Sequence, residues 1–338
     1  MNEPEIVLLH NRPVLPKDHP DAGSEYDVLD TVAQVKNLFD EAGQKIRVLG
    51  VVEPHELIED VRQHKPNVVL NLFEGLANRT ETEIAAAAVL EWLQVPFTGS
   101  TSLAIALGRD KIRSKYMLQG AGIPTPDFAV AYQGSIGEWT HGWPAIVKPA
   151  CQDSSFGIDQ DSVVTNQHAL CNRVQYILAQ YGPPVLIEKF IAGRELHANL
   201  LEMQRTSSPV RELVSVPLAE VCFRGEYYRD RWPLYSYTAK WDENSQDSLY
   251  APVNAPVFVE PHLWTQIEKH SRAAFHLFGV RDYARIDWRI TPEGEPMVLE
   301  INPNPFLLSS TLTTGLSTMG FLHPDWLIQM TLQAMARG

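Results

Sequence analysis

The chain has 338 residues and carries 41 Asp and Glu against 28 Lys and Arg, a formal net charge of -13 at pH 7. A chain of this length builds roughly two or three domains, and its negative field repels nucleic acids and anionic membranes alike. We therefore expect neither as a partner. The first residues carry no basic leader, no apolar run is long enough to span a bilayer, and the 3 cysteines are scattered. These features indicate a cytoplasmic protein without a disulfide framework.

Short apolar segments alternate with amphipathic ones in the first third of the chain. Strands are expected at 5–9, 46–51 and 67–72, and helices at 24–42, 56–64 and 82–93. Strictly alternating strands and helices are typical of a parallel sheet covered by helices on both faces. We therefore expect an α/β, doubly wound N-terminal domain over residues 1–107.

The pattern changes after residue 107, where strands and helices no longer alternate regularly. We expect in chain order a helix at 110–120, a turn at 122–126, a strand at 145–149, a small polar loop at 151–157, a helix at 166–181 and a strand at 185–191. The last third holds long mixed strands, a hairpin and a C-terminal helix from about residue 324 to 337. This texture predicts two α+β domains, a central one over 108–191 and a C-terminal one over 192–338.

Lys148 stands at the end of an apolar strand, and the loop after it offers Ser154, Ser155 and Gly157. Small residues let a loop close over phosphates with its amides pointing inward, while a strand-borne lysine supplies a fixed charge. An ordinary surface lysine beside a turn gives the same pattern, and Lys111 is equally ambiguous. Both interpretations stay open on these residues alone.

The segment 284–305 has the pattern of a hairpin with one polar face. Ile286 and Trp288 alternate with Arg285 and Asp287, residues 291–294 have turn chemistry, and residues 297–301 run back. Asp287 and Glu300 then share a face, with Asn302 one repeat further along. Three oxygen-bearing groups in one place favour a cation, although a solvated face explains the acids too.

Taken together, these segments resemble the ATP-grasp superfamily and, within it, the D-alanine–D-alanine ligases. The resemblance runs in family order from about residue 66 to 312. The matching segments are 96–100, 110–111, 114–115, 122–126, 147–149, 154–157, 188–189, 193–195, 237–240, 285–287 and 300–305. Each segment is weak alone, but the ordered set is specific.

The resemblance implies where ATP and Mg²⁺ lie, between antiparallel sheets of the central and C-terminal domains. It implies Lys111 and Lys148 on the phosphates and Ser154 with Ser155 in the covering loop. Adenine and ribose would meet Glu188, Lys189 and Ile191, with Glu195 on the sugar. The ligands of two Mg²⁺ ions, with Mn²⁺ as a possible substitute, would be Asp287, Glu300 and Asn302. The implied catalytic residues are Arg285, Lys240 and Ser154, and Lys240 would also contact ATP.

The resemblance also implies an activity, carboxylate–amine ligation. ATP would phosphorylate a small-molecule carboxylate, and an amine would displace phosphate from the acyl phosphate while ADP is released. Loops at 153–157 and 234–250 would exclude water from that intermediate. The family further leads us to expect a homodimer formed through the first domain.

The substrate side departs from the family pattern. Glu74 stands where these ligases carry a His, Phe306 replaces a Gly, and Trp241 replaces a Tyr. Thr311 replaces a Ser, and Glu25 belongs to a shortened segment, 24–27. We expect all five to line the substrate pocket and predict substrates other than two D-alanines. A ligase with a thiol or hydroxyl acceptor, or a nucleotide-binding protein without turnover, are the alternatives.

Overall fold

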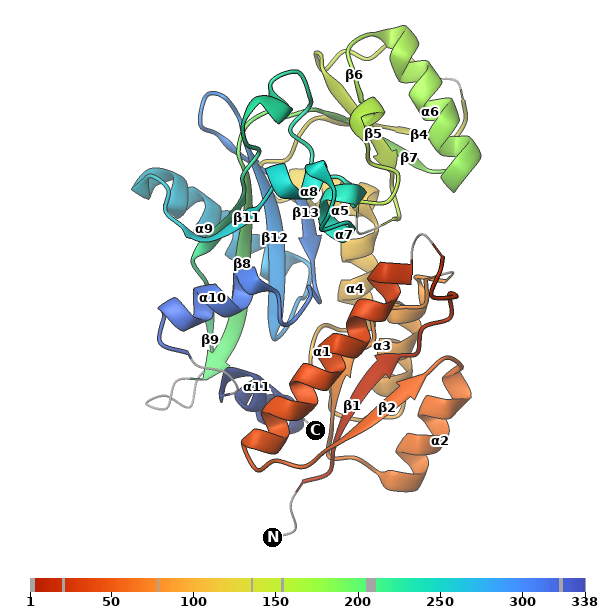
Figure 1. Cartoon of the computed structure of the whole chain (residues 1–338), viewed down its shortest axis with the longest axis vertical. Coiled ribbons are helices and arrows are strands. Elements are labelled where there is room, and N and C mark those ends of the chain that lie inside the picture. The colour runs from red at the N-terminus through yellow and green to blue at the C-terminus, as the bar shows by residue number, and fades with distance from the viewer. Residues whose placement is uncertain are drawn as a thin grey trace.

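The computed structural model describes residues 4–19, 22–77, 79–134, 136–152, 155–204, 211–321 and 325–337. The N-terminal domain is a parallel three-stranded sheet of order β2-β1-β3 (Figure 1). Its elements are β1 (Ile6–Asn11), α1 (Ala22–Glu41), β2 (Ile46–Val51), α2 (Pro54–His64), β3 (Val68–Leu72) and α3 (Thr82–Trp92). Ile6 and Leu8 of β1 pack with α1, whereas Val7 and Leu9 pack with α2 and α3. The predicted doubly wound domain is confirmed, since helices cover both faces.

The central region is an antiparallel sheet of order β4-β7-β5-β6. Its elements are β4 (Phe128–Ala131), β5 (Ala145–Pro149), η1 (Gln160–Ser162), β6 (Val163–Val164), α6 (Gln167–Tyr181) and β7 (Val185–Lys189). Helix α6 covers one face with Leu170, Val174 and Ile177. The predicted strand 185–191 was too long, because the sheet pairing ends at Lys189.

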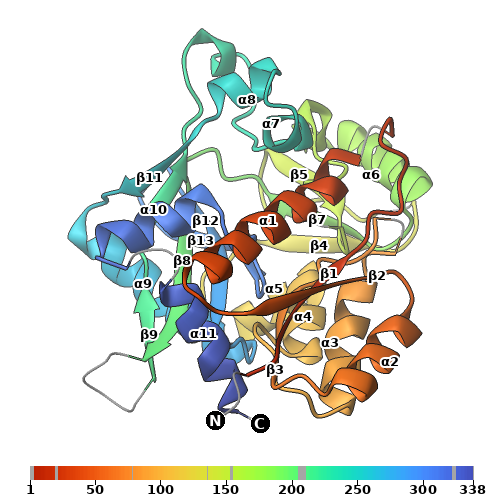
Figure 2. The ribbon, with the colours of Figure 1, turned by 60° about the horizontal axis from the view of Figure 1, so that its bottom comes forward.

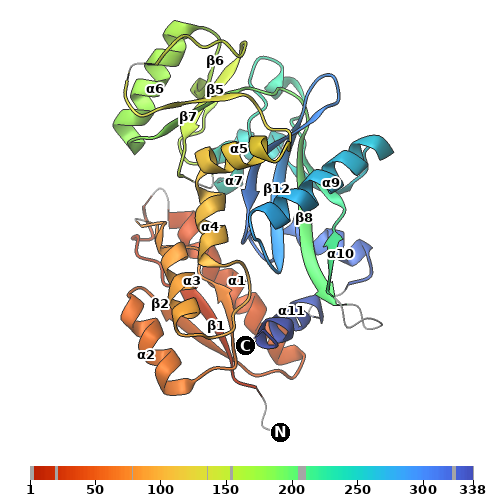
Figure 3. The same ribbon diagram turned by 180° about the vertical axis from the view of Figure 1, so that it is seen from behind.

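Two consecutive helices connect the N-terminal domain to the central sheet (Figure 3). They are α4 (Ser102–Arg109), which the sequence analysis did not predict, and α5 (Lys111–Gly120). The carboxylate of Asp110 accepts a 2.9 Å hydrogen bond from the backbone N–H of Arg113 and so caps α5. This cap separates two helices that differ in direction.

The C-terminal region is a six-stranded sheet in which β12 is flanked by β8 and β13. Its strands are β8 (Glu195–Gln204), β9 (Arg211–Ser215), β10 (Leu218–Val221), β11 (Val253–Val257), β12 (Tyr283–Ile290) and β13 (Pro296–Asn302). The helical segments are η2 (Glu226–Tyr228), α7 (Tyr237–Trp241), α8 (Gln246–Tyr250), α9 (Pro261–Leu277) and α10 (Ser310–Thr318). Helices α9 and α10 were not predicted. Ile286 and Trp288 of β12 are fully buried in the cluster that includes α9, so the polar residues of β12 face the other side.

The last helix, α11 (Asp325–Met335), lies beside the N-terminal domain although it follows the C-terminal sheet (Figure 2). Trp326, Leu327 and Met330 share one hydrophobic cluster with residues of β1, β3 and β8. Arg337 pairs with the buried Asp282 and donates to the carbonyl of Phe97 at 2.7 Å. The end of the described chain therefore ties the first domain to the last sheet. None of the described helices is long and apolar enough to cross a bilayer.

Candidate active site

A band of polar side chains crosses three strands on one face of the C-terminal sheet. In the register of β12, Asp287 lies opposite Glu300 and Arg285 opposite Asn302, as the alternation predicts. On its other side β12 pairs with β8, and the opposed residues are Arg285 with Asn199, Asp287 with His197 and Arg289 with Glu195. Directly opposed residues point to the same face of a sheet. The band therefore combines the predicted carboxylates of Asp287 and Glu300 with His197, Asn199 and Arg289, which the prediction did not include.

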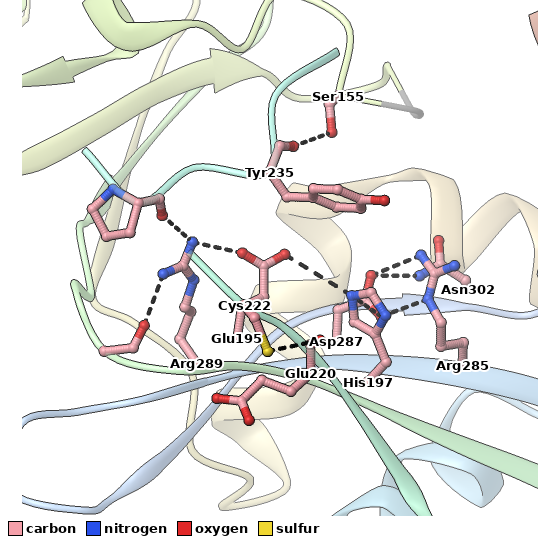
Figure 4. A network of polar contacts seen from close by, with 12 residues as sticks. Ser155, Glu195, His197, Glu220, Cys222, Tyr235, Arg285, Asp287, Arg289 and Asn302 are labelled. Atoms are coloured by element: carbon pink, nitrogen blue, oxygen red, sulfur yellow. Dashed lines mark hydrogen bonds and ion pairs between the residues drawn. The ribbon is translucent and has the colours of Figure 1, made fainter. Parts of the chain in front are cut away.

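Asp287 is held between Arg285 and Asn302 (Figure 4). The Arg285 guanidinium donates from Nε to Oδ1 at 2.7 Å and from Nη2 to Oδ2 at 2.9 Å, while Asn302 Nδ2 donates to Oδ2 at 3.2 Å. Burial alone would lower the pKa of Arg285, but the charge and hydrogen bonds of Asp287 raise it above its ordinary value. Arg285 is thus a permanent cation in this band.

Glu300 is the centre of a cluster of cations. Lys111 Nζ lies 3.3 Å from Glu300 Oε2 and also donates to the carbonyl of Gln152 at 2.8 Å. Burial would raise the pKa of Glu300, but the charges of Lys111, Lys240, Lys148 and Arg285 lower it well below its usual range. The carboxylate is therefore ionised, and several positive charges converge on it.

On the central sheet, Glu188 lies between two lysines. Its carboxylate forms ion pairs with Lys115 through Oε1 and with Lys148 through Oε2. Burial would raise the pKa of Glu188, but these two charges lower it. Burial lowers the pKa of Lys115 to about 8 even though Glu188 opposes the change. The structure thus pairs Glu188 with Lys148, two residues that the sequence analysis assigned to the nucleotide, and with Lys115, to which it assigned no role.

The remaining predicted nucleotide residues lie around this pair in different settings. Ile191 is buried and Lys189 is exposed, with its backbone N–H donating to the carbonyl of Asp127 at 2.9 Å. Glu195 is buried, which raises its pKa, and its Oε2 accepts a 2.6 Å bond from Arg289. Because Arg289 holds Oε2, the expected contact of Glu195 with a sugar would use Oε1.

Arg289 and His197 belong to this site, although the sequence analysis did not single them out. Arg289 also donates to the carbonyls of Gly193 at 2.9 Å and Pro233 at 2.5 Å. His197 Nε2 lies 4.0 Å from carboxylate oxygens of both Glu195 and Asp287, and burial lowers its pKa to about 4 (Figure 4). A signal was present in the sequence, because Glu195, His197 and Asn199 alternate with apolar residues along β8.

Two segments that the sequence analysis expected to act as lids contact each other. Ser155 Oγ donates to the carbonyl of Tyr235 at 2.9 Å. Just outside these two segments, Gln160 and Trp232 exchange two hydrogen bonds, of 3.1 and 2.8 Å. Lys240 lies 5.3 Å from the centroid of the Tyr235 ring, and burial followed by the charge of Arg285 lowers its pKa. The predicted residue Ser154 lies outside the described residues.

The five expected substrate residues are placed in unequal ways. Both oxygens of the buried Glu25 serve the backbone, accepting from Val14 at 3.0 Å, Leu15 at 2.8 Å and Ala77 at 3.2 Å. The structure therefore gives Glu25 a role in holding two loops together. Glu74 keeps contact with solvent, yet the loss of water on its protein side and the charge of Asp27 raise its pKa to about 7.

The other three lie in or near α7 and α10. Trp241 ends α7, with its ring 6.5 Å from that of Tyr237. Phe306 is half-buried, and Thr311 is buried in the first turn of α10, where its hydroxyl lies 3.2 Å from Ser309 Oγ. Phe306 and Thr311 thus lie on the chain that continues from Asn302, whereas Trp241 lies in a separate helix.

Asp287, Glu300 and Asn302 have the chemistry of a magnesium site. Among the residues that the structure describes, no group of three or more His, Cys, Asp and Glu side chains could hold a metal. The predicted set instead consists of two carboxylates and an amide, which are the hard oxygen donors that Mg²⁺ prefers. In the structure, Arg285 pairs with Asp287 and Lys111 pairs with Glu300. The three residues therefore fit a metal ion, provided that an anionic ligand enters with the metal and pairs with Arg285 and Lys111 in place of the carboxylates.

Comparison with known proteins agrees with this arrangement. A family model described as "D-ala D-ala ligase C-terminus" matches residues 117–332. A D-alanine–D-alanine ligase of Pelobacter propionicus is 29% identical over 251 residues, 73% of either chain. The protein y4sG of Sinorhizobium fredii is 34% identical over 241 residues, which are 71% of this chain and 66% of that one. The crystal structure of a Bacillus anthracis D-alanine–D-alanine ligase complexed with ATP superimposes with a TM-score of 0.73 at 19% identity, covering 99% of this chain and 98% of that one.

The separate antiparallel sheets of the central and C-terminal regions, together with the superposition over 99% of the chain, indicate an ATP-grasp fold. The family model covers more than half of the chain, which is enough to assign the chain to a family within this fold. The chain belongs to the D-alanine–D-alanine ligase-like family. This membership supports an enzyme of the ligase type.

Proposed function

We propose that the protein is an ATP-dependent carboxylate–amine ligase that forms a peptide-type bond through an acyl phosphate. ADP and phosphate are the other products. The observation that carries this proposal is the gathering of Lys111, Lys240, Lys148 and Arg285 around Glu300. Lys111 pairs with Glu300, Arg285 with Asp287, and Lys148 and Lys115 with Glu188. With Lys240, these cations outnumber the three carboxylates, so the site has positive charge to spare for a polyphosphate.

The nucleotide is held by groups from both sheets. Lys111 and Lys148 bind its phosphates, and the segment containing Ser155 covers them. The purine lies against Glu188, Lys189 and Ile191, and Glu195 contacts the sugar. Asp287, Glu300 and Asn302 would hold two Mg²⁺ ions, or Mn²⁺ in their place. Bound there, the metal would neutralise the charge of the phosphates.

Phosphoryl transfer to a substrate carboxylate depends on positioning and on charge. Arg285 and Lys240 would stabilise the negative charge that develops on the transferred group, and both side chains are half-buried, which strengthens their fields. An amine then attacks the acyl carbon, the tetrahedral intermediate collapses, and phosphate leaves. The contact between Ser155 and Tyr235 keeps water from the reactive acyl group.

We propose that the two small-molecule substrates are not both D-alanine. Glu74 offers an acid of raised pKa where the family has an imidazole, and Phe306 adds a bulky ring where the family has no side chain. Trp241 and Thr311 alter the same pocket in size and polarity. The cytoplasmic location and the homodimer remain predictions from the sequence.

The test is phosphate release from ATP and Mg²⁺ with a panel of carboxylates and amines, offered singly and in pairs and including D-alanine, with mass detection of products. A ligated product other than D-alanyl-D-alanine is the expected result. Products from thiols or alcohols alone would replace the amine by another acceptor. Binding of Mg-ATP without turnover of any member of a broad panel would favour a nucleotide-binding protein without catalysis.

A further inference from the structure

Lys115 is the most deeply buried charged side chain of the nucleotide region, and the proposed reaction does not use it. Its side chain has 0% exposure, whereas that of Lys148 has 8%. Both lysines pair with the same carboxylate, Glu188. Because Lys115 is sealed from solvent, it is not placed to touch a nucleotide directly.

All three N–H donors of Lys115 have an acceptor. One pairs with Glu188 Oε1, one donates to Thr125 Oγ1 at 2.7 Å, and one to the carbonyl of Val298 at 3.3 Å. Thr125 Oγ1 in turn donates to the carbonyl of Val298 at 2.7 Å. An ammonium has three donors, so this lysine is fully committed. Its position is therefore fixed by three segments of the chain at once.

The environment of Lys148 is different. It holds the other oxygen of Glu188, but its side chain keeps 8% exposure, so unlike Lys115 it remains accessible to a ligand. A lysine that moved from Glu188 to a phosphate would normally leave a buried anion without a partner, which is strongly unfavourable. Here Glu188 would keep Lys115.

We propose that Lys115 is a positioning residue that serves as the permanent counter-ion of Glu188, so that Lys148 can exchange Glu188 for a phosphate oxygen of ATP. The inference rests on the proposed function only in requiring that ATP binds. It assigns different tasks to two lysines that share one carboxylate. Helix α5, which carries Lys111 and Lys115 one turn apart, then serves both the metal-binding hairpin and the purine side (Figure 3).

The experiment compares the affinities of ATP and adenosine, measured by calorimetry with Mg²⁺, in the whole protein. Adenosine has no phosphate and does not need Lys148 to move. In Lys115→Met the affinity ratio of ATP to adenosine should fall roughly ten- to hundredfold, the worth of one hydrogen bond to a charged group. Lys115→Arg, which keeps the charge, should retain most of the ratio.

Charge removal at Glu188 gives the decisive comparison. Without a carboxylate to neutralise, Lys115→Met should no longer matter, so the double variant with Glu188→Gln should match Glu188→Gln alone within about threefold in the ratio. Arg113→Met, an exposed change on the same helix, is the matched control and should leave the ratio unchanged. If Lys115→Met does not fold, Lys115→Gln carries the same expectation.

Equal loss of ATP and adenosine affinity in Lys115→Met would overturn the inference, because a packing role predicts that result. A double variant that stays as impaired as Lys115→Met would overturn it too. If the wild-type protein binds ATP and the ratio is unchanged by Lys115→Met, only this inference fails. If the wild-type protein does not bind ATP, the proposed function fails with it.

Discussion

Glu300→Gln changes the charge of the candidate metal site while keeping the shape of the side chain. Lys111 Nζ lies 3.3 Å from Glu300, which corresponds to an attraction of about 5 kcal/mol at an effective dielectric constant of about 20. Desolvation of the two charges offsets much of this energy, and Lys111 keeps the carbonyl of Gln152. We therefore expect the free energy of unfolding to fall by only about 1–3 kcal/mol, so that the variant remains folded.

The effect on ligand binding should be larger and should depend on the metal. Replacing a charged ligand by an amide removes about 1.5–3 kcal/mol of interaction, so kcat/KM should fall roughly 10- to 150-fold. Without Mg²⁺ the opposite holds, because one anion that repels phosphates has gone. In EDTA the variant should bind ATP at least as tightly as the wild-type protein.

The assay is calorimetric ATP affinity with Mg²⁺ and with EDTA, together with ADP release once a substrate pair is known. Glu293→Gln is the matched control, since it makes the same change in the exposed turn of the same hairpin. It should behave as the wild-type protein in every measurement. A Glu300→Gln variant whose ATP affinity gains as much from Mg²⁺ as the wild-type protein would refute the metal assignment.

Three further predictions concern the acceptor pocket, the domain contact and a raised pKa. Phe306→Gly should change the panel of accepted amines while ATP affinity stays within about threefold, and an identical product profile would count against a pocket role. Arg337→Ala leaves the buried Asp282 without its ion pair and should lower the free energy of unfolding by about 2–4 kcal/mol in urea titrations. Arg229→Ala, at an exposed pair, should cost less than about 1 kcal/mol, and equal losses would contradict the argument. Desolvation and the charge of Asp27 raise the pKa of Glu74 from 4.5 to about 7, so its contribution to stability is fully present below pH 4.5 and is lost as the pH rises through 7; the contribution is small because the side chain is exposed. Urea unfolding from pH 5 to 8 should therefore show a steeper fall for the wild-type protein than for Glu74→Gln, and parallel curves would argue against the raised pKa.

The hairpin was predictable because local signals decide it. Alternation fixes which residues of β12 share a face, and the turn at 291–294 sets which residues of β13 oppose them. The structure pairs Asp287 with Glu300 although the register shifts between Asp287 and Trp288. The pairing next to the turn, in which Trp288 faces Val298, would place Leu299 opposite Asp287. The shift brings Glu300 there instead, and the turn alone does not predict it.

Partners from distant segments could not be read in the same way. Arg289 has the alternation of a strand residue, but its pairing with Glu195 depends on β8 lying beside β12. The same holds for Lys115, whose sequence context shows only a second lysine one turn after Lys111. Glu25 was assigned to the substrate by resemblance, whereas the structure engages its oxygens with three backbone N–H groups. A sequence motif can identify such a residue, but its role depends on which residues of distant segments contact it in the fold.

The unpredicted helices have separate causes. Helix α9 begins at Pro261 and buries Leu263, Ile267, Ala274 and Phe275, a spacing typical of an amphipathic helix that was overlooked among expected strands. Helix α10 has two threonines and a serine in its first turn and a glycine within it, so its intrinsic propensity is poor. Leu312 and Leu316 secure it by packing into the core shared with α11.

The hydrogen bond from Ser155 to Tyr235 and the paired bonds between Gln160 and Trp232 have a kinetic consequence. These bonds fasten segments of the central and C-terminal regions to each other, so neither segment can move away without breaking the bonds or carrying the other. In the proposed mechanism, product release would then require both segments to open together. Weakening one fastening, for example with Gln160→Ala, would quicken that event and expose the activated acyl group to hydrolysis, uncoupling ATP consumption from bond formation.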